Sequence, residues 1–420
     1  MKVVIINPGS HPAPSYIAEA LAADQRLSAY WTSAQFLPSE TARLGQQFQN
    51  ASKARTLPQG IPGSLVRRRG VTQDLVATYW RRLRRREREV EALYRRNQAV
   101  ARAAVRFALS QGRHDEQVGL LFSTNTRGGA APLVLRAEIA YALYTPLPYL
   151  PALTALMDAE AEANPRWARF LAHRSGGGSD SDPDAEVEVA GASFVLANSR
   201  LTAQSYAGVI APERILTQPL AVDLELLNVL RASRPNTQLR DTATPLRLLF
   251  AGQVTQRKGL SYLFQGLESL SDRRIELTVV GSDPLGMSAE LVRAFPHVRV
   301  RFRGPVSQPQ LWDEMGRQDV LVLPSLAEGL ANVLLEALAL GMPVVATDRS
   351  GAADLEVDGV AGIVVPHSDS TALAGALARL SDDDGTLLAE FGEGAVRLSH
   401  DRGTWADYGR RLAGALDRPW

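Results

Sequence analysis

Short apolar runs alternate with longer amphipathic stretches along nearly the whole chain. The apolar runs are continuous rather than alternating, which is typical of parallel strands covered on both faces. Strands are predicted at 2–6, 28–32, 117–123, 140–145, 193–198, 247–253, 276–281, 298–303, 319–325, 343–347 and 361–365. Helices are predicted at 16–23, 72–110 (one long helix or two shorter ones), 130–136, 158–172, 185–190, 199–207, 259–270, 289–295, 308–317, 330–340, 370–380, 387–399 and 404–416. This alternation predicts an α/β fold with two doubly wound parallel sheets.

The 420 residues exceed what one ordinary core holds, so two domains are expected. We place an N-terminal acceptor-side domain at 1–220 and a C-terminal donor domain at 221–403, with a final helix at 404–420 that crosses back to the first domain. Segments 42–63, 175–183 and 223–244 are polar and rich in turn residues, and are expected to be irregular. Residues 214–218 are expected to enter the crossing between the domains.

Composition narrows the classes of protein that fit. The chain is 45 % hydrophobic and 22 % charged, as is ordinary for a soluble globular protein. It has no cysteine, which excludes disulfides, thiolate metal sites and cysteine nucleophiles and suits a cytoplasmic protein. The first apolar run ends at Asn7-Pro8-Gly9 and is too short for a signal peptide. No run of about 18 apolar residues predicts a transmembrane helix.

Positive charge is concentrated in one region. Residues 53–113 contain 16 Lys/Arg and 4 Asp/Glu, whereas the remainder has 30 and 41. Within it, the predicted basic helical segment 64–113 carries aromatic residues among its arginines. One interpretation is attachment to an anionic membrane surface, and another is a solvated helix packed on the acidic remainder. Nucleic acid is not expected as a partner, because no recognition motif is present and the rest of the chain is acidic.

The stretch 324–362 carries the first candidate chemistry. Glu328 and Glu336 stand eight positions apart, and Gly329 and the predicted helix start near Leu330 follow the first of them. The first amides of a helix have no partner within the helix and form a ready anion site. A glycine there lets a ligand approach the backbone closely. The two carboxylates could hold different parts of one elongated ligand, although a solvated helix face is the alternative.

A second stretch places two cations at another helix start. The strand ending at Gly252 and Gln253 is followed by Arg257-Lys258-Gly259. Cations at a helix N-terminus oppose the helix dipole, which favours a bound anion over a merely solvated pair. A lysine there can neutralise a leaving diphosphate when no metal is present.

Together these stretches resemble the GT4 family of retaining glycosyltransferases, which have the GT-B fold. The resemblance rests on the Glu-x7-Glu pattern of Glu328 and Glu336, on PSLAEGLANVLLEALALGMPVVAT, and on a Gln-x-x-x-Arg-Lys-Gly donor loop typical of a sub-group. It is strong over 190–400 and holds only in outline before that. It implies two Rossmann-like domains facing a central cleft, a nucleotide-diphosphate sugar as donor, and a saccharide or lipid-linked acceptor in polysaccharide or glycoconjugate synthesis. It also implies that no metal and no cofactor are needed.

The resemblance assigns roles to individual residues. Lys258, together with Arg257, would bind the donor diphosphate, Glu328 the sugar hydroxyls and Glu336 the ribose hydroxyls. The remaining expected donor contacts are Gly252, Gln253, Gly304, Val306, Gly329, Leu330, Ala331, Asn332 and Val333. No enzyme nucleophile is implied, because the donor's own phosphate can assist deprotonation of the acceptor on the same face. Lys258 and Glu328 are therefore the expected catalytic residues, acting through charge and positioning.

The sequence departs from the family pattern at three places. Gln253 stands where many members have arginine, and Asp354 where glutamate is common. The loop 123–129, which includes Asn125, lacks the histidine that many members carry there. We hypothesise that His11, which follows Gly9 in the first loop, positions the acceptor and joins the catalytic residues; a structural loop histidine is the alternative.

Two other function classes stay open at this point. A catalytically weak partner subunit would keep the donor fold, and the missing histidine and Gln253 favour it. A nicotinamide oxidoreductase also has two α/β domains, but no predicted strand here is followed by Gly-x-Gly-x-x-Gly. The sugar, the base and the acceptor are not readable from the sequence.

Overall fold

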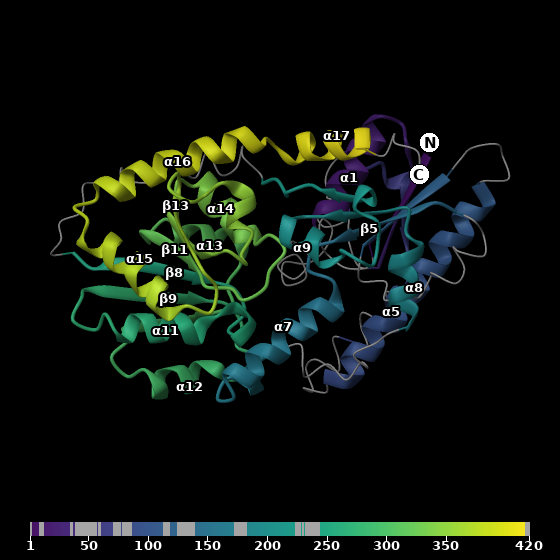
Figure 1. Ribbon diagram of the computed structural model, residues 1–420. Coiled ribbons are helices and arrows are strands. Elements are labelled where there is room, and N and C mark those ends of the chain that lie inside the picture. Colours follow the sequence, from purple (N-terminus) through teal and green to yellow (C-terminus); the bar gives the residue numbers. More distant parts are fainter. Residues whose placement is uncertain are drawn as a thin grey trace, which may run out of the picture.

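The chain forms two α/β units that lie side by side in the computed structural model (Figure 1). The structure describes residues 2–7, 12–33, 60–69, 86–111, 118–123, 139–171, 183–222 and 244–415, with single positions 37, 57, 77, 228 and 231 between them. The predicted irregular segments 42–63, 175–183 and 223–244 and the loop 124–129 lie wholly or mostly outside these residues.

Each unit is built on a parallel sheet. The N-terminal sheet has the strand order β3-β2-β1-β4-β5-β6-β7 and the C-terminal sheet the order β10-β9-β8-β11-β12-β13. The first comprises β1 Lys2–Ile6, β2 Leu27–Thr32, β3 Val66–Arg68, β4 Val118–Ser123, β5 Tyr141–Thr145, β6 Phe194–Ala197 and β7 Ile215–Thr217. The second comprises β8 Leu246–Ala251, β9 Ile275–Val280, β10 Val300–Gly304, β11 Val320–Leu323, β12 Val344–Thr347 and β13 Gly362–Val365. The predicted pair of doubly wound parallel sheets is confirmed.

Helices cover both sheets. In the N-terminal half they are α1 Pro12–Ala23, α5 Arg86–Gln111, α7 Leu150–Ala163, α8 Pro183–Gly191 and α9 Arg200–Ser205. In the C-terminal half they are α11 Leu260–Glu268, α12 Met287–Ala294, α13 Gln308–Met315, α14 Asn332–Ala339, α15 Ser370–Asp382, α16 Thr386–Arg402 and α17 Trp405–Ala415. Short 3-10 turns include η5 Ala168–Phe170, η7 Gln256–Lys258 and η8 Ala352–Leu355. Strands such as β12 are buried along their whole length, which explains their continuous apolar sequence.

Two helices begin at least four residues before their predicted starts. The helix predicted at 16–23 begins at Pro12, where proline is tolerated in the first turn. The helix predicted at 158–172 instead runs from Leu150 to Ala163, with a proline in its first turn. Asn164 ends it and Pro165 follows, so only the short turn η5 continues toward 172.

Two strands depart from the prediction. Residues 214–218 were not predicted as a strand, but Ile215–Thr217 is β7, the edge strand of the N-terminal sheet beside β6. The strand β3 was not predicted, because its sequence lies within a run of arginines that reads as polar. It pairs with β2, and only Val66 of its side chains is buried.

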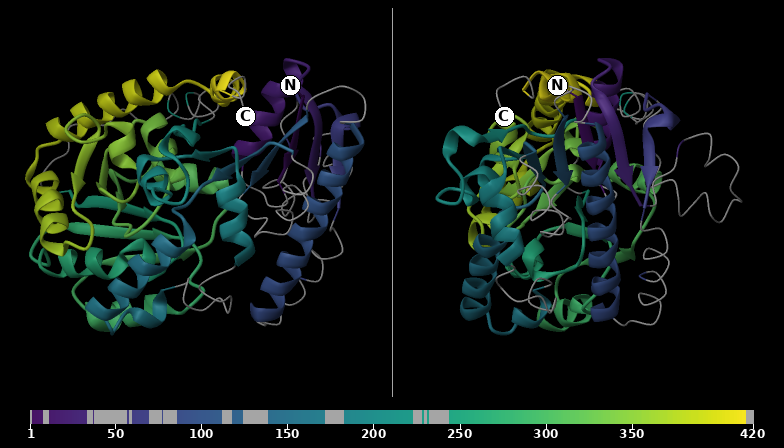
Figure 2. Two further views of the ribbon diagram at one scale, coloured as in Figure 1. Left: turned by 45° about the vertical axis from the view of Figure 1, so that its right-hand side comes forward. Right: turned by 90° about the vertical axis from the view of Figure 1, so that its right-hand side faces the viewer.

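The helix α7 belongs by sequence to the first half but packs on the second. Leu153, Met157, Trp167 and Phe170 share one apolar cluster with C-terminal residues such as Phe264. Figures 1 and 2 show α7 reaching from the N-terminal sheet to the side of α11 and α12. The segment 150–171 is thus part of the core of the C-terminal unit.

The helix α17 makes the reverse crossing. It follows α16 along one side of the molecule and ends against α1 (Figure 1). The rings of Tyr16 and Trp405 stack with centroids 4.6 Å apart, and Arg26 Nη1 donates to Ala413 O at 2.8 Å. In the part of the chain that the structure describes, no helix combines the length and apolar character needed to cross a membrane.

Candidate functional site

The turn η7 forms at the carboxyl end of β8. Its hydrogen bonds run from Lys258 N to Thr255 O at 3.1 Å and from Gly259 N to Gln256 O at 2.7 Å. Gly259 has a φ of 70°, and a Cβ there would lie 1.7 Å from Pro324 O. Only glycine fits this left-handed position and close approach. The turn is therefore pressed against the loop 324–331 that leaves β11.

The predicted donor-binding charges meet at this junction. Glu328 Oε1 accepts a hydrogen bond from Arg257 Nη1 at 2.8 Å and forms an ion pair with Lys258 Nζ. Arg257 Nη1 also donates to Ala327 O at 2.6 Å. Arg257 and Glu328 are 9 % and 7 % exposed, so this is a buried group of two cations and one carboxylate. Its net positive charge favours an additional anion.

The pKa values follow from this burial. Burial acts to raise the pKa of the Glu328 carboxyl, but the charges and hydrogen bonds of Lys258 and Arg257 outweigh it, and the pKa lies below its usual value. Burial lowers the pKa of the Lys258 ammonium, helped by the nearby Arg257, while Glu328 opposes the change. A diphosphate beside Lys258 would favour its charged form.

The helix α14 starts two residues later than the predicted start at Leu330. Its first hydrogen bond joins Leu334 N to Ala331 O at 3.0 Å. The backbone N–H groups of Asn332 and Val333 come before this bond and therefore have no acceptor within the helix. The loop before it is held by Glu328 N, which donates to Arg349 O at 3.0 Å. The N-terminus of α14 therefore follows closely after Glu328, the carboxylate that contacts the two cations.

Glu336 lies one turn into α14 and is half-buried. Its Oε2 accepts a hydrogen bond from Gln308 Nε2 at 2.8 Å. Burial raises the pKa of its carboxyl to about 7, although the hydrogen bond from Gln308 acts in the other direction. Gln308 begins α13 directly after the loop of Gly304 and Val306, so the predicted base loop and Glu336 lie next to each other.

The remaining predicted donor residues border this group. A Cβ on Gly252 would lie 3.6 Å from Lys258 Cε, while Gln253 is exposed. Leu330 and Ala331 are buried in the core below the loop. The predicted acceptor-side residues Gly9, His11 and Asn125 lie outside the described residues.

The N-terminal unit contacts this site through residues that sequence reasoning missed. A Cβ on Gly329 would lie 2.1 Å from Pro146 O and 2.4 Å from Asn198 Oδ1. Pro146 and Asn198 directly follow β5 and β6, so the carboxyl edges of the two sheets face each other here. Their place at the carboxyl ends of predicted strands was the only available signal, because neither residue type suggests a site.

A polar contact crosses the same boundary. Asp354 Oδ1 accepts from Arg200 N at 2.8 Å and from Arg200 Nε at 3.2 Å, and Arg200 Nη2 donates to Ala353 O at 2.8 Å. Arg200 is the first residue of α9, so the carboxylate also satisfies a helix-start amide. Asp354, one of the departures from the family pattern, thus joins the two units.

Across the described ranges, no group of three or more His, Cys, Asp or Glu side chains is placed to hold a metal ion.

The C-terminal unit is similar in sequence to a known protein family. The family described as "Glycosyl transferases group 1" matches residues 245–383, which contain every donor-side residue discussed above. The amylovoran biosynthesis glycosyltransferase AmsK of Erwinia amylovora is 29 % identical over 194 residues, covering 44 % of this chain and 47 % of AmsK. The D-inositol 3-phosphate glycosyltransferase of an Arthrobacter species is 31 % identical over 182 residues, covering 41 % and 43 %. The matched segment spans less than half the length of these relatives.

Solved structures resemble the whole chain. HepE of Anabaena, crystallised with UDP and with UDP-glucose, aligns over 100 % of both chains with a TM-score of 0.61 and 16 % identity. The sucrose-phosphate synthase of Thermosynechococcus elongatus aligns over 99 % of this chain and 98 % of its own, with a TM-score of 0.62 and 18 % identity. These likenesses show that the chain has the GT-B fold.

Proposed function

We propose that this protein is a glycosyltransferase that moves a sugar from a nucleotide-diphosphate sugar to a saccharide or lipid-linked acceptor in polysaccharide or glycoconjugate synthesis. The observation that carries the proposal is the buried contact of Arg257 and Lys258 with Glu328 at the start of α14. It lies inside the segment that matches the glycosyltransferase family. The names of AmsK and of the UDP-glucose complex of HepE support this class of donor and product.

The proposed reaction is the one that the resemblance to retaining glycosyltransferases implies. The donor diphosphate binds Lys258, Arg257 and the first amides of α14, and Glu336 holds the ribose hydroxyls. The bond between the anomeric carbon and the phosphate oxygen breaks, the acceptor oxygen bonds to that carbon on the same face, and its proton passes to the leaving phosphate. The configuration is thereby retained. The two cations stabilise the negative charge of the leaving diphosphate, so the transfer needs neither a metal nor a cofactor.

Ligand binding tests this proposal first. UDP-, GDP-, ADP- and TDP-sugars are added to the purified chain, and the thermal unfolding temperature is recorded. The matching donor raises that temperature, because a ligand of the folded state stabilises it by mass action. Transfer and donor hydrolysis are then measured with and without EDTA. A stabilising donor that is neither hydrolysed nor transferred points to the inactive partner subunit, and stabilisation by no donor rejects the proposed function.

The arginine-rich helix α5 suggests where the acceptor is met. Its buried face packs on the N-terminal core, and its exposed face carries a mainly basic stripe at helical spacing: Arg88, Glu91, Arg95, Arg102, Arg106 and Leu109. Within it, Arg95 Nη2 forms an ion pair with Glu91 Oε1 at 2.5 Å. We propose that this stripe attaches a cytoplasmic protein to the anionic inner face of the membrane. The charge supports a lipid-linked acceptor.

Flotation with lipid vesicles tests the attachment. We expect binding to vesicles containing phosphatidylglycerol but not to pure phosphatidylcholine. Replacing Arg95, Arg102 and Arg106 by glutamine should weaken binding roughly a hundredfold, since each basic residue contributes about 1 kcal/mol near such a surface. The matched control replaces three exposed arginines of the C-terminal unit, namely Arg299, Arg317 and Arg379. Equal losses in both variants would mean that binding depends only on the net charge of the protein, and the proposed role of the α5 stripe would be rejected.

A further inference from the structure

A buried carboxylate from the N-terminal half of the chain lies against the donor loop. Glu160, on α7, is 7 % exposed. Its Oε1 accepts hydrogen bonds from Gln256 Nε2 at 2.7 Å and Asn164 Nδ2 at 3.1 Å, and its Oε2 accepts one from Tyr262 OH at 2.9 Å. A buried carboxylate is tolerated only when donors surround it, and two of these three come from the C-terminal unit.

Gln256 links this carboxylate to the candidate site. It begins η7, two positions before Lys258, and it is fully buried. Its Nε2 also donates to Ser261 Oγ at 2.7 Å, at the start of α11. On the other side of the turn, Leu326 N donates to Arg257 O at 2.9 Å. The turn that carries both cations is therefore held between α7 and the loop 324–331.

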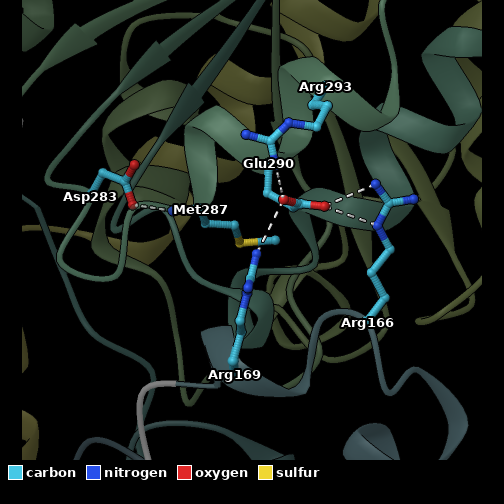
Figure 3. A network of polar contacts seen from close by, with 6 residues as sticks. All are labelled: Arg166, Arg169, Asp283, Met287, Glu290 and Arg293. Carbon is cyan, nitrogen blue, oxygen red and sulfur yellow. Dashed lines mark hydrogen bonds and ion pairs between the residues drawn. The ribbon is translucent and has the colours of Figure 1, made fainter.

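The far end of the same segment is attached as well. Figure 3 shows Glu290 of α12 surrounded by three arginines, two of which come from the residues after α7. Arg166 Nη2 and Arg169 Nη2 donate to its two carboxylate oxygens at 2.9 Å and 3.1 Å. With the apolar cluster described above, these contacts hold 150–171 on the C-terminal unit along its length. Glu160 is thereby kept at a fixed place relative to η7.

We propose that Glu160 is a positioning residue for the donor diphosphate, acting through Gln256 on the turn that carries Arg257 and Lys258. The inference rests on the proposed function and extends it, because the donor site then depends on a side chain outside the matched segment 245–383. Without Glu160, Gln256 loses one of its two buried acceptors and keeps only Ser261 Oγ, and the turn loses its hydrogen bond to α7. The cations remain, but they are no longer held in the geometry that the diphosphate needs.

Glu160→Ala and Glu160→Gln test this role, with Glu162→Gln as the control. Glu162 lies on the same helix and is exposed. The probe is whichever of UDP, GDP, ADP and TDP stabilises the wild-type chain most. We expect Glu160→Ala to raise the Kd of this nucleotide and the KM of its sugar about tenfold, with a smaller change in kcat. Glu160→Gln keeps most of the hydrogen bonds and should recover most of the affinity, and Glu162→Gln should match the wild type.

A double-mutant cycle separates positioning from plain stability. If Glu160 acts through Gln256, Glu160→Ala and Gln256→Ala raise the Kd non-additively, and the double variant resembles either single one. An unchanged Kd and KM in the folded Glu160→Ala protein, with only a lower unfolding temperature, would overturn the inference. Additive losses in the cycle would overturn it too. A wild-type chain that binds none of the four nucleotides would instead reject the proposed function, and the inference with it.

Discussion

The carboxylate of Asp354 satisfies the backbone N–H and the guanidinium of Arg200 across the boundary between the two units, at 2.8 Å and 3.2 Å. The side chain of Asp354 is 7 % exposed, so this contact is sheltered on the C-terminal side. The contact lies near the place where Gly329 approaches Asn198, because Asn198 comes two residues before Arg200. The pair therefore helps to set how closely the loop 324–331 and the N-terminal unit approach each other.

Asp354→Ala is expected to loosen this approach without unfolding either unit. The variant removes the acceptor of the first amide of α9 and of Arg200 Nε, so that only the bond from Arg200 Nη2 to Ala353 O still joins the pair. We expect the radius of gyration from small-angle X-ray scattering to increase, and kcat/KM for transfer to fall roughly tenfold, as for the loss of one hydrogen bond to a charged group.

The Arg247–Asp319 pair is a matched control within the C-terminal unit. Asp319 also accepts from the backbone N, the Nε and the Nη2 of its arginine, at 2.8, 3.2 and 2.8 Å. Asp319→Ala should lower the unfolding temperature but leave the radius of gyration unchanged. If both variants gave the same scattering curve as the wild type, Asp354 would have no part in holding the units together.

Gly329→Ala tests the contact between the units with a single methyl group. The added Cβ would meet Pro146 O and Asn198 Oδ1 at distances that real Cβ atoms do not show. The methyl group keeps the two units from approaching this closely, so we expect a loss of transfer of roughly a hundredfold. Gly375→Ala is the control, because a Cβ on that glycine of α15 meets nothing within 4 Å. Full transfer activity in Gly329→Ala would show that the reaction does not need this approach of the units.

The strands and helices of the C-terminal unit could be predicted from the sequence because their signals are local. The strands before Arg257 and Glu328 read as continuous apolar runs, and loops after parallel strands share one edge of a sheet. The contact of Glu328 with the two cations was not predicted, because the resemblance assigns Glu328 to the sugar hydroxyls rather than to Arg257 and Lys258. Only side-chain packing shows this ion pair.

Contacts between distant segments could not be predicted. Glu160 and Gln256 are 96 positions apart, and α7 reads as an ordinary helix of the first half. Its attachment to the other unit depends on Trp167 and Phe170, whose partners no local pattern identifies. The strand β3 was missed for a different reason: arginines occupy positions where a buried strand would show apolar residues.

Lys258→Ala should lower turnover at least a hundredfold while the chain stays folded. The variant removes the cation that would stabilise the leaving diphosphate, a loss comparable to that of one oxyanion-stabilising donor, roughly 2.7–4 kcal/mol. Glu328 keeps its hydrogen bond from Arg257, so the buried carboxylate retains a partner. Circular dichroism and the unfolding temperature check the fold, and kcat is measured with the identified donor. A rate near that of the wild type would contradict the assignment of Lys258.

Glu328→Gln is expected to separate nucleotide binding from sugar transfer. The variant removes the carboxylate that now competes with a diphosphate for Arg257 and Lys258. The affinity for the free nucleoside diphosphate should therefore stay equal or increase. Turnover of the sugar nucleotide should fall at least roughly tenfold, because the sugar hydroxyls lose the charged carboxylate to which they donate hydrogen bonds. Calorimetry with the nucleotide and a transfer assay measure the two effects. A parallel loss of both would mean that Glu328 acts mainly in folding.

Glu336 makes the stability of the unliganded chain depend on pH. Its carboxyl has a pKa of about 7 in the folded chain, against an ordinary value of 4.5. Between these values the folded chain holds a proton that the unfolded chain has released, so this group lowers the free energy of unfolding as pH rises through that interval, by at most about 3 kcal/mol. Glu336→Gln cannot release a proton and should flatten the dependence.

The same titration should control nucleotide binding in the opposite direction. The ionised carboxylate accepts hydrogen bonds from two ribose hydroxyls better than the protonated one, so we expect the affinity of the wild type to rise from about pH 6 to about pH 8. Glu336→Gln should bind more weakly, turn over at least a hundredfold more slowly and lose this pH dependence. Denaturant unfolding and calorimetry at both pH values measure the two effects. Identical pH profiles for the variant and the wild type would show that Glu336 is not the group that titrates.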